Sequence, residues 1–257
     1  MRIVSLCPSN TELLVALGLW DDVVGVDDDS DWPPAVNTKP RVGRDLNIDA
    51  EKVAALQPDL VVASLSVPGM ERNIEELERL GLPYIILNPQ HIDEIADNFR
   101  LLGSACGVPA RGQEEADKFL RKLETIASRT THVTYRPTLY WEWWPNPVYT
   151  PGRDNWLTDI SRLAGGENLF AEVPTDNVKT DHASVAAKDP DFVLIVWCGV
   201  PIEKIKKEKI TGRPEWDQMS AVRNNRVHIL QEGYYCRPSQ RLLTGLEALV
   251  NLIHPEL

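Results

Sequence analysis

The 257-residue sequence predicts an α/β protein of two similar lobes, each with a parallel sheet, joined by one long helix. Short apolar, β-branched runs alternate with helical patterns in both halves of the chain, which is typical of βα units. Between the halves lie about forty residues of helical pattern without a strand. A sequence repeat relates the two halves to each other.

The first half shows strands and helices in alternation. The strands are expected at residues 2–6, 23–26, 60–63 and 84–87. The helices are expected at residues 10–18, 49–56 and 70–80. We expect Asn10 or Ser9 to cap the first helix. Gly18 and Gly81 should end the first and third helices, because glycine readily adopts the left-handed conformation that commonly follows a helix.

The middle of the chain is helical. Apolar residues recur at helical spacing from Ile92 to Leu102 and again from Ala116 to Ile126. The second helix, about 20 residues from Ala110, spans roughly 30 Å, which is the width of a small domain. We expect it to bridge the lobes as a stiff rod that allows only small opening movements. The expected domains are therefore residues 1–104, 105–132 and 133–257.

The second half resumes the alternation, with strands expected at residues 138–143, 191–197 and 226–230 and helices at 155–163, 181–187, 202–209 and 239–252. Residues 48–71 align with residues 180–203 without a gap and share 8 identities, among them Asp49 with Asp181 and Pro58 with Pro190. We interpret this as an internal duplication. The alternative is that a helix followed by Pro-Asp and a strand is a common pattern. Because ligands bind outside the carboxyl ends of parallel strands, two facing lobes predict one ligand cleft between them.

The charge of the chain excludes several classes of partner. Lys and Arg number 27 against 38 Asp and Glu, which gives a net charge of −11. This is the wrong sign for neutralising phosphates or anionic lipids, so we expect neither nucleic acid nor a membrane surface as a partner. The longest apolar runs are far shorter than the roughly 20 residues that span a bilayer.

Catalytic and metal-binding motifs are missing from the sequence. The five histidines show no ligand spacing, and there is no phosphate-binding loop or nucleophile elbow. The four cysteines, at positions 7, 106, 198 and 236, are scattered, so we interpret them as mostly buried thiols and find no sign of a disulfide framework. Cys7, near a helix start, is either a nucleophile or cobalt ligand of lowered pKa or a small apolar residue at a tight turn. We expect no enzyme activity.

Several segments carry a resemblance to a known family. They are residues 3–14 (IVSLCPSNTELL), 148–153 (VYTPGR), 162–168 (RLAGGEN), 235–239 (YCRPS), 245–249 and 254–256. With these segments the chain resembles, over essentially its whole length, the helical-backbone (class III) substrate-binding proteins of ABC importers. The resemblance is strongest to the cobalamin-binding branch.

The resemblance implies two Rossmann-like lobes that hold a corrinoid between them and deliver it to an ABC permease. It also implies a monomer with no cofactor of its own, the corrinoid being the transported ligand. Ferric-siderophore and haem-binding proteins share this scaffold and are the alternatives for the ligand. The family is periplasmic or attached to the cell surface. This sequence begins where the mature family domain begins and shows no secretory leader, so a cytoplasmic corrinoid-handling protein is the alternative.

The aromatic residues are the main candidates for ligand contact. Trp20 and Trp32 lie in the first half, and the other six of the eight tryptophans lie in the second. A corrin ring is broad, flat and largely apolar with amides at its rim, so it favours aromatic planes beside a few hydrogen-bonding groups. The residues expected to line the site are Trp32, Ser64, Leu65, Trp143, Trp144, Trp156, Trp197, Tyr234 and Tyr235. The repeat pairs Trp197 with Leu65. The alternative for a tryptophan such as Trp143 is packing within a buried strand.

Two arginines and two glutamates complete the expected functional residues. Arg44 and Arg153 lie in loops predicted at the mouth of the site, where they could bind a phosphate or amides of cobalamin, or siderophore carboxylates. The alternative is an ion pair of each with its neighbouring Asp. Glu71 and Glu203 are related by the repeat, and the resemblance implies that they dock into arginine pockets of the permease. The alternative is that each acid only stabilises the first turn of its helix.

Overall fold

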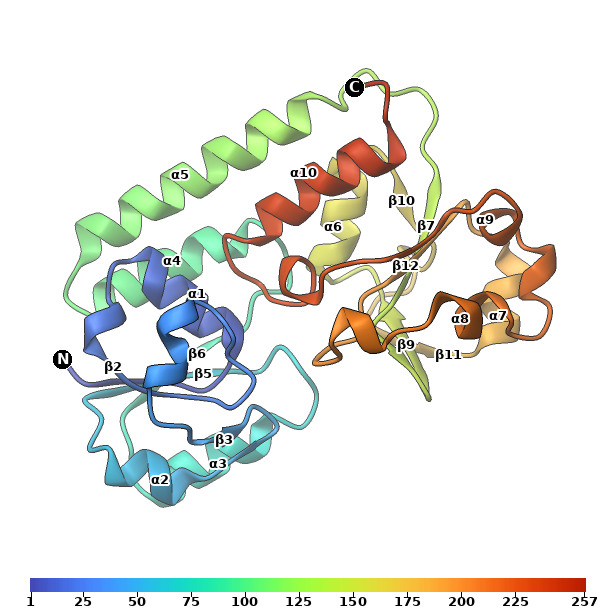
Figure 1. Ribbon diagram of the computed structural model, residues 1–257. Coiled ribbons are helices and arrows are strands. Elements are labelled where there is room, and N and C mark those ends of the chain that lie inside the picture. Colours follow the sequence, from blue (N-terminus) through green and yellow to red (C-terminus); the bar gives the residue numbers. More distant parts are fainter. The chain divides into compact units, whose positions relative to one another are not determined.

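The computed structural model describes all residues from 1 to 257, and the chain forms two compact units (Figure 1). Unit 1 comprises Met1–Pro89 and Asp93–Leu120, and unit 2 comprises Gln90–Ile92 and Arg121–Leu257. Helix α5 (Pro109–Ser128) therefore contributes its first part to unit 1 and its last part to unit 2. This 20-residue helix confirms the long helix predicted from Ala110. No helix is both long and apolar enough to cross a membrane.

Unit 1 is built on a four-stranded parallel sheet in the order β2-β1-β5-β6. Its strands are β1 (Ile3–Ser5), β2 (Val23–Val26), β5 (Leu60–Ser64) and β6 (Tyr84–Leu87). Its other helices are α1 (Pro8–Ala16), α2 (Ala50–Ala55), α3 (Glu71–Arg79) and α4 (Glu94–Ala105), and a short hairpin joins β3 (Gly43–Arg44) to β4 (Asn47–Ile48). β5 is buried along its whole length, as expected of a parallel strand covered on both faces.

Unit 2 carries a parallel sheet in the order β10-β7-β12-β13. Its strands are β7 (Thr138–Glu142), β10 (Glu167–Asn168), β12 (Phe192–Ile195) and β13 (Val227–Ile229). Its helices are α6 (Trp156–Leu163), α7 (His182–Lys188), α8 (Lys207–Thr211), α9 (Ser220–Arg223) and α10 (Leu242–Ile253). A second, antiparallel sheet in the order β11-β9-β8 was not predicted; it consists of β8 (Trp144–Pro145), β9 (Val148–Pro151) and β11 (Asn177–Thr180).

The two parallel sheets have the same topology, as the sequence repeat predicts. In each, the first strand in sequence lies between an edge strand and the strand that follows the repeated helix. The repeated helices also begin in the same way: the Asp49 carboxylate accepts a hydrogen bond from Lys52 N, and the Asp181 carboxylate accepts one from Ser184 N. The identities in the repeat therefore correspond to equivalent structural positions.

Two expectations about helices were wrong. The N-cap of α1 is Cys7 with Pro8 at the first helical position, rather than Asn10 or Ser9. Asn10 instead uses its side-chain amide to donate to the carbonyls of Val62 and Ala63 in β5, at 3.0 Å each. The helix expected at residues 202–209 is split into a 3-10 turn (Ile202–Lys204) and α8, because Ile205 between them is extended and buries its side chain.

Helices α4 and α5 are packed backbone against backbone within unit 1. A Cβ atom on Gly103 would lie 2.7 Å from Gly112 Cα, and one on Gly112 would lie 2.6 Å from the Phe99 carbonyl oxygen. Neither distance can accommodate a carbon atom, and the opposing atoms belong to the backbone, so no rotamer change can relieve the clash. The absence of both side chains therefore sets how closely the two helices approach.

We expect Gly103→Ala and Gly112→Ala to destabilise the protein by about 1–3 kcal/mol each, because overpacking forces backbone shifts. The measurement is the urea midpoint of unfolding. Ser104→Ala is the matched control, since Ser104 is the exposed neighbour of Gly103 in α4, and it should leave the midpoint nearly unchanged. An equal response of Ser104→Ala and Gly103→Ala would contradict the close packing.

A buried polar cluster lies at the carboxyl end of β2 in unit 1. Asp27 is fully buried; its carboxylate accepts hydrogen bonds from Ser30 Oγ at 2.5 Å and from Asp29 N at 2.9 Å. The cation nearby, Arg41, donates to the carbonyls of Asp27 and Ser30 and not to the carboxylate. Burial, with a smaller contribution from the carboxylate of Asp45, raises the pKa of Asp27 from 3.8 to about 7.

Asp27 makes the stability of the protein depend on pH. Because its pKa is higher in the folded than in the unfolded chain, the folded state holds the proton more tightly, and the free energy of unfolding should fall as pH rises from about 4 to about 7. The slope approaches about 1.4 kcal/mol per pH unit in that window. We expect Asp27→Asn to flatten this fall in urea unfolding across pH 4 to 8, whereas the exposed control Asp21→Asn should retain it. Parallel profiles for the wild type and Asp27→Asn would contradict the assignment.

Candidate functional site

The carboxyl edge of the parallel sheet in unit 2 is formed by the ends of β7 and β12. In open α/β sheets this edge is where ligands bind. Glu142 is the last residue of β7, Trp143 follows it, and Trp197 lies two residues beyond the end of β12. The backbone continues the pairing past the strands, since Val196 N donates to Glu142 O and Cys198 N donates to Trp143 O. The backbone segments that carry Trp143 and Trp197 are therefore adjacent.

The position of Trp197 depends on a buried carboxylate. Glu142 has no exposed surface and accepts hydrogen bonds from Trp197 Nε1 at 2.9 Å and from both terminal nitrogens of Arg213 at 2.7 Å. Burial opposes ionisation of Glu142, but its hydrogen bonds and ion pairs outweigh burial and lower its pKa to about 2. His182 Nε2 lies 3.5 Å away, at the outer limit of a hydrogen bond, so we assign the charge compensation chiefly to Arg213.

A second aromatic group in unit 2 combines three of the residues predicted to line the site. The rings of Trp143 and Trp156 stack with centroids 5.5 Å apart, and Trp156 Nε1 donates to the carbonyl oxygen of Tyr235 at 2.8 Å. All three side chains are buried, and the Tyr235 hydroxyl donates to Gly245 O. Trp143 Nε1 is also buried but makes no hydrogen bond. These residues therefore form a packed layer in which one indole N–H, that of Trp143, makes no hydrogen bond.

The remaining aromatic candidates of unit 2 lie nearer the surface. Trp144 is 43% exposed, and its Nε1 donates to the carbonyl oxygen of Asn146 two residues on. Tyr234 is half-buried and stacks under the guanidinium of Arg241, whose Cζ lies 4.9 Å from the ring centroid. Trp144 thus presents an apolar face to solvent, in contrast to the buried layer.

In unit 1, Ser64 ends β5 at the carboxyl edge of the sheet and is buried. Its hydroxyl oxygen accepts from Ser66 N at 3.1 Å and lies 2.9 Å from the Ser66 hydroxyl. Leu65, between the two serines, is half-buried, as is Trp32. This edge therefore offers hydroxyl groups and little aromatic surface.

The predicted arginines are exposed and paired with carboxylates. Arg44 binds Asp29 at 3.0 Å rather than its neighbour Asp45, and Arg153 binds its neighbour Asp154 at 3.0 Å. The ion pair with the neighbouring aspartate, which was the alternative to a ligand contact, is therefore present for Arg153. Both guanidinium groups remain mostly exposed, at 68% for Arg44 and 57% for Arg153, so neither pair prevents a further contact.

The two glutamates related by the repeat are both exposed but differ in local structure. Glu71 is the first residue of α3, and its carboxylate accepts a hydrogen bond from Gly69 N at 2.8 Å. Glu203 lies in the 3-10 turn rather than in the first turn of an α-helix. The alternative of helix stabilisation therefore applies to Glu71 but not to Glu203.

The chemistry of the cysteines argues against a nucleophilic Cys7. Burial raises the pKa of the Cys7 thiol to about 12, so it stays protonated and fits the role of a small apolar residue. No group of three or more His, Cys, Asp or Glu side chains is arranged to hold a metal ion.

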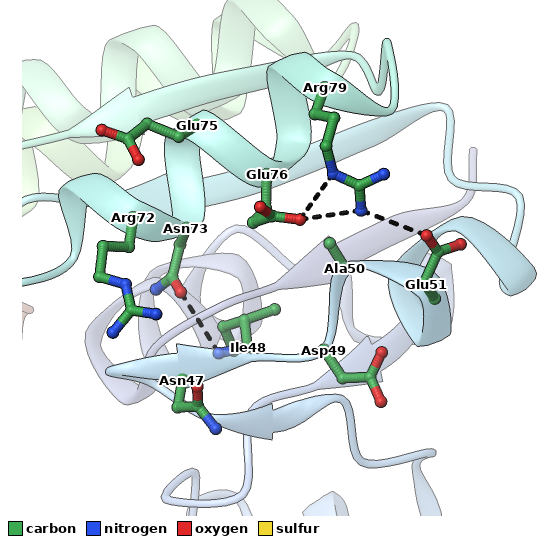
Figure 2. Close-up of a pocket in the computed structure, with 10 residues that line it drawn as sticks. All are labelled: Asn47, Ile48, Asp49, Ala50, Glu51, Arg72, Asn73, Glu75, Glu76 and Arg79. Atoms are coloured by element: carbon green, nitrogen blue, oxygen red, sulfur yellow. Dashed lines mark hydrogen bonds and ion pairs between the residues drawn. The ribbon is translucent and has the colours of Figure 1, made fainter.

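A surface hollow of about 420 Å³ lies elsewhere in unit 1, between the β4–α2 segment and α3 (Figure 2). Its charged groups are largely paired: Arg79 binds Glu76 at 2.8 Å and Glu51 at 3.2 Å, and the side chain of Asn73 accepts from Ile48 N. None of the residues predicted for ligand contact lines this hollow. Its geometry gives no support for a ligand site there.

Comparisons with known proteins agree with the fold. A curated relative in Bacillus subtilis, the uncharacterized ABC transporter substrate-binding lipoprotein YvrC, is 28% identical over 99% of this chain and 80% of the relative. The vitamin B12-binding protein of Vibrio cholerae serotype O1 is 30% identical over 96% of this chain and 86% of the relative. The crystal structure of the periplasmic vitamin B12-binding protein BtuF of Vibrio cholerae superposes with a TM-score of 0.82 at 27% identity, covering 98% of this chain and 96% of that one.

These relatives are described as binding proteins and not as enzymes. The family model described as "Periplasmic binding protein" matches residues 3–234. The predicted fold class and the predicted resemblance to ABC-importer substrate-binding proteins are thereby confirmed, and this chain belongs to the periplasmic binding protein family.

Proposed function

We propose that this protein captures a corrinoid such as cobalamin and presents it, chemically unchanged, to an ABC permease. The vitamin B12-binding relative, 30% identical over nearly the whole chain, supports the ligand class. Membership of the substrate-binding family implies a small-molecule ligand and a permease as partners. The ligand would contact the residues at the carboxyl edge of the parallel sheet in unit 2.

The observation that carries this proposal is the fixed indole of Trp197. Its hydrogen bond to the buried Glu142 holds the ring at the end of β12, so little side-chain freedom is lost when a flat ligand stacks on it. A broad, flat and largely apolar ring is the kind of ligand that such a fixed indole fits.

A calorimetric titration with cyanocobalamin, cobinamide, haem and ferrichrome tests the ligand class. We expect the corrinoids to bind in the micromolar range or tighter, that is about −8 kcal/mol or better, and the haem and the ferric siderophore to bind far more weakly. Tight binding of ferrichrome or haem, with no corrinoid binding below millimolar, would overturn the corrinoid assignment and favour the siderophore or haem alternative.

Substitution of the aromatic residues tests the site itself. Trp197→Ala and Trp144→Ala should weaken corrinoid binding by about 10- to 100-fold, which is typical of aromatic contacts at a binding surface. Trp197→Phe, which keeps an apolar ring but loses the bond to Glu142, should have an intermediate affinity. Trp20→Ala is the matched control, because Trp20 precedes β2 and so lies at the amino end of the sheet in unit 1. Equal affinity of Trp197→Ala and Trp20→Ala would remove Trp197 from the site.

We further propose that Glu71 and Glu203 dock the loaded protein to its permease. Both carboxylates are exposed, and Glu203 makes neither a helix cap nor an ion pair that would account for it. Arginine side chains bind such carboxylates through two parallel hydrogen bonds.

Charge reversal tests the docking role. Glu71→Arg and Glu203→Arg should lower the stimulation of ATP hydrolysis by the reconstituted importer about tenfold or more while leaving corrinoid affinity unchanged, because truncating or reversing one partner of an ion pair weakens the complex. Glu124→Arg, at an exposed position of α5, is the control. Corrinoid binding without any stimulation of an ABC importer by the wild type would favour the cytoplasmic corrinoid-handling alternative.

A further inference from the structure

Two of the four cysteines, distant in sequence, meet at the carboxyl edge of unit 2. Cys198 directly follows Trp197, and Cys236 directly follows Tyr235. Both thiols approach the same backbone oxygen: Cys236 Sγ lies 3.1 Å and Cys198 Sγ lies 4.0 Å from Val196 O. Nothing in the sequence indicated that these two thiols lie near the same backbone oxygen.

The backbone holds both cysteines in place. Cys198 N donates to Trp143 O at 3.2 Å, and Cys236 N donates to Glu232 O at 2.9 Å. Neither residue is fully buried, and the residue after Cys198, Gly199, is exposed and has a positive φ of 67°. A small oxidant can therefore approach Cys198.

We propose that Cys198 and Cys236 are a redox-responsive pair that forms a disulfide by exchange with a low-molecular-weight disulfide such as oxidised glutathione. The thiolate of Cys198 attacks one glutathione sulfur, the disulfide of glutathione breaks, and one glutathione thiolate leaves. Cys236 then loses its proton and attacks the sulfur of Cys198, which releases the second glutathione. Two protein thiols are oxidised to one disulfide, one glutathione disulfide is reduced to two thiols, and both protons pass to the released glutathiones.

The order of attack follows from the surroundings of the two thiols. Burial and the neighbouring Cys198 raise the pKa of Cys236 well above its ordinary value, so Cys236 is a poor first nucleophile. Once Cys198 is bound to glutathione, Cys236 is the remaining thiol of the pair and the one that can resolve the mixed disulfide.

The disulfide would join two segments that carry candidate ligand residues. One segment follows β12 and carries Trp197. The other precedes α10 and carries Tyr234 and Tyr235. On the proposed function, the oxidised and reduced forms should therefore differ in corrinoid affinity. The disulfide itself does not depend on the identity of the ligand.

Thiol mapping after exposure to oxidised glutathione tests the pair. The wild type is unfolded after the reaction, its free thiols are alkylated, and its peptides are mapped by mass spectrometry. We expect one linked peptide pair containing Cys198 and Cys236, a mass lower by two hydrogens, and Cys7 and Cys106 still alkylated. In Cys236→Ser we expect Cys198 to be trapped as a glutathione adduct, and in Cys198→Ser we expect Cys236 to remain a thiol.

The same peptide mapping also shows which results would contradict the disulfide. Two free thiols at 198 and 236 in excess oxidant, or separate glutathione adducts on both without a link, would overturn the proposal. The wild-type map stands by itself if a serine variant does not fold. A calorimetric titration of the oxidised and reduced wild type with cyanocobalamin then measures the effect on affinity: loss of corrinoid binding in both forms would contradict the proposed function and leave the disulfide intact.

Discussion

The carboxylate of Glu142 is the interaction on which the candidate site of unit 2 depends. A charge at the end of a buried strand is costly unless it is paired and hydrogen-bonded. Here the guanidinium of Arg213 binds it with two parallel bonds, Tyr140 donates to it from the same strand, and Trp197 donates to it from the segment after β12. One buried group thereby fixes β7, the segment after β12 and the distant segment that carries Arg213. The side chains at this edge of unit 2 are therefore positioned by a group in its interior.

The repeated scaffold carries a different edge in each unit. The repeat aligns Ser64, Leu65 and Ser66 of unit 1 with Val196, Trp197 and Cys198 of unit 2. The strands, their order and the aspartate caps of the preceding helices are retained, because they stabilise the fold. The residues beyond the strands are free to differ, so one edge presents hydroxyl groups and the other presents an indole and a thiol.

Much of the fold followed from local patterns, whereas the site depends on contacts that no local pattern encodes. β6 has the predicted bounds, and the long helix and both parallel sheets were expected. The antiparallel sheet was missed because the prolines of residues 145–151 suggested a loop. Glu142 was not predicted, because in the sequence it is only one acid within an aromatic strand and nothing near Arg213 indicates that the two residues pair. Likewise, composition could not separate Trp156, packed in the interior, from the exposed Trp144.

The uneven distribution of tryptophan has a spectroscopic consequence. Six of the eight indoles belong to unit 2, and they range from the fully enclosed Trp141 and Trp216 to the solvent-facing Trp144. Intrinsic emission from this protein is therefore mainly a signal of one unit. Unfolding followed by tryptophan fluorescence would mainly record the loss of structure in unit 2, because only Trp20 and Trp32 report on unit 1. Intrinsic tryptophan fluorescence therefore reports mainly on the unit where the aromatic candidates are concentrated.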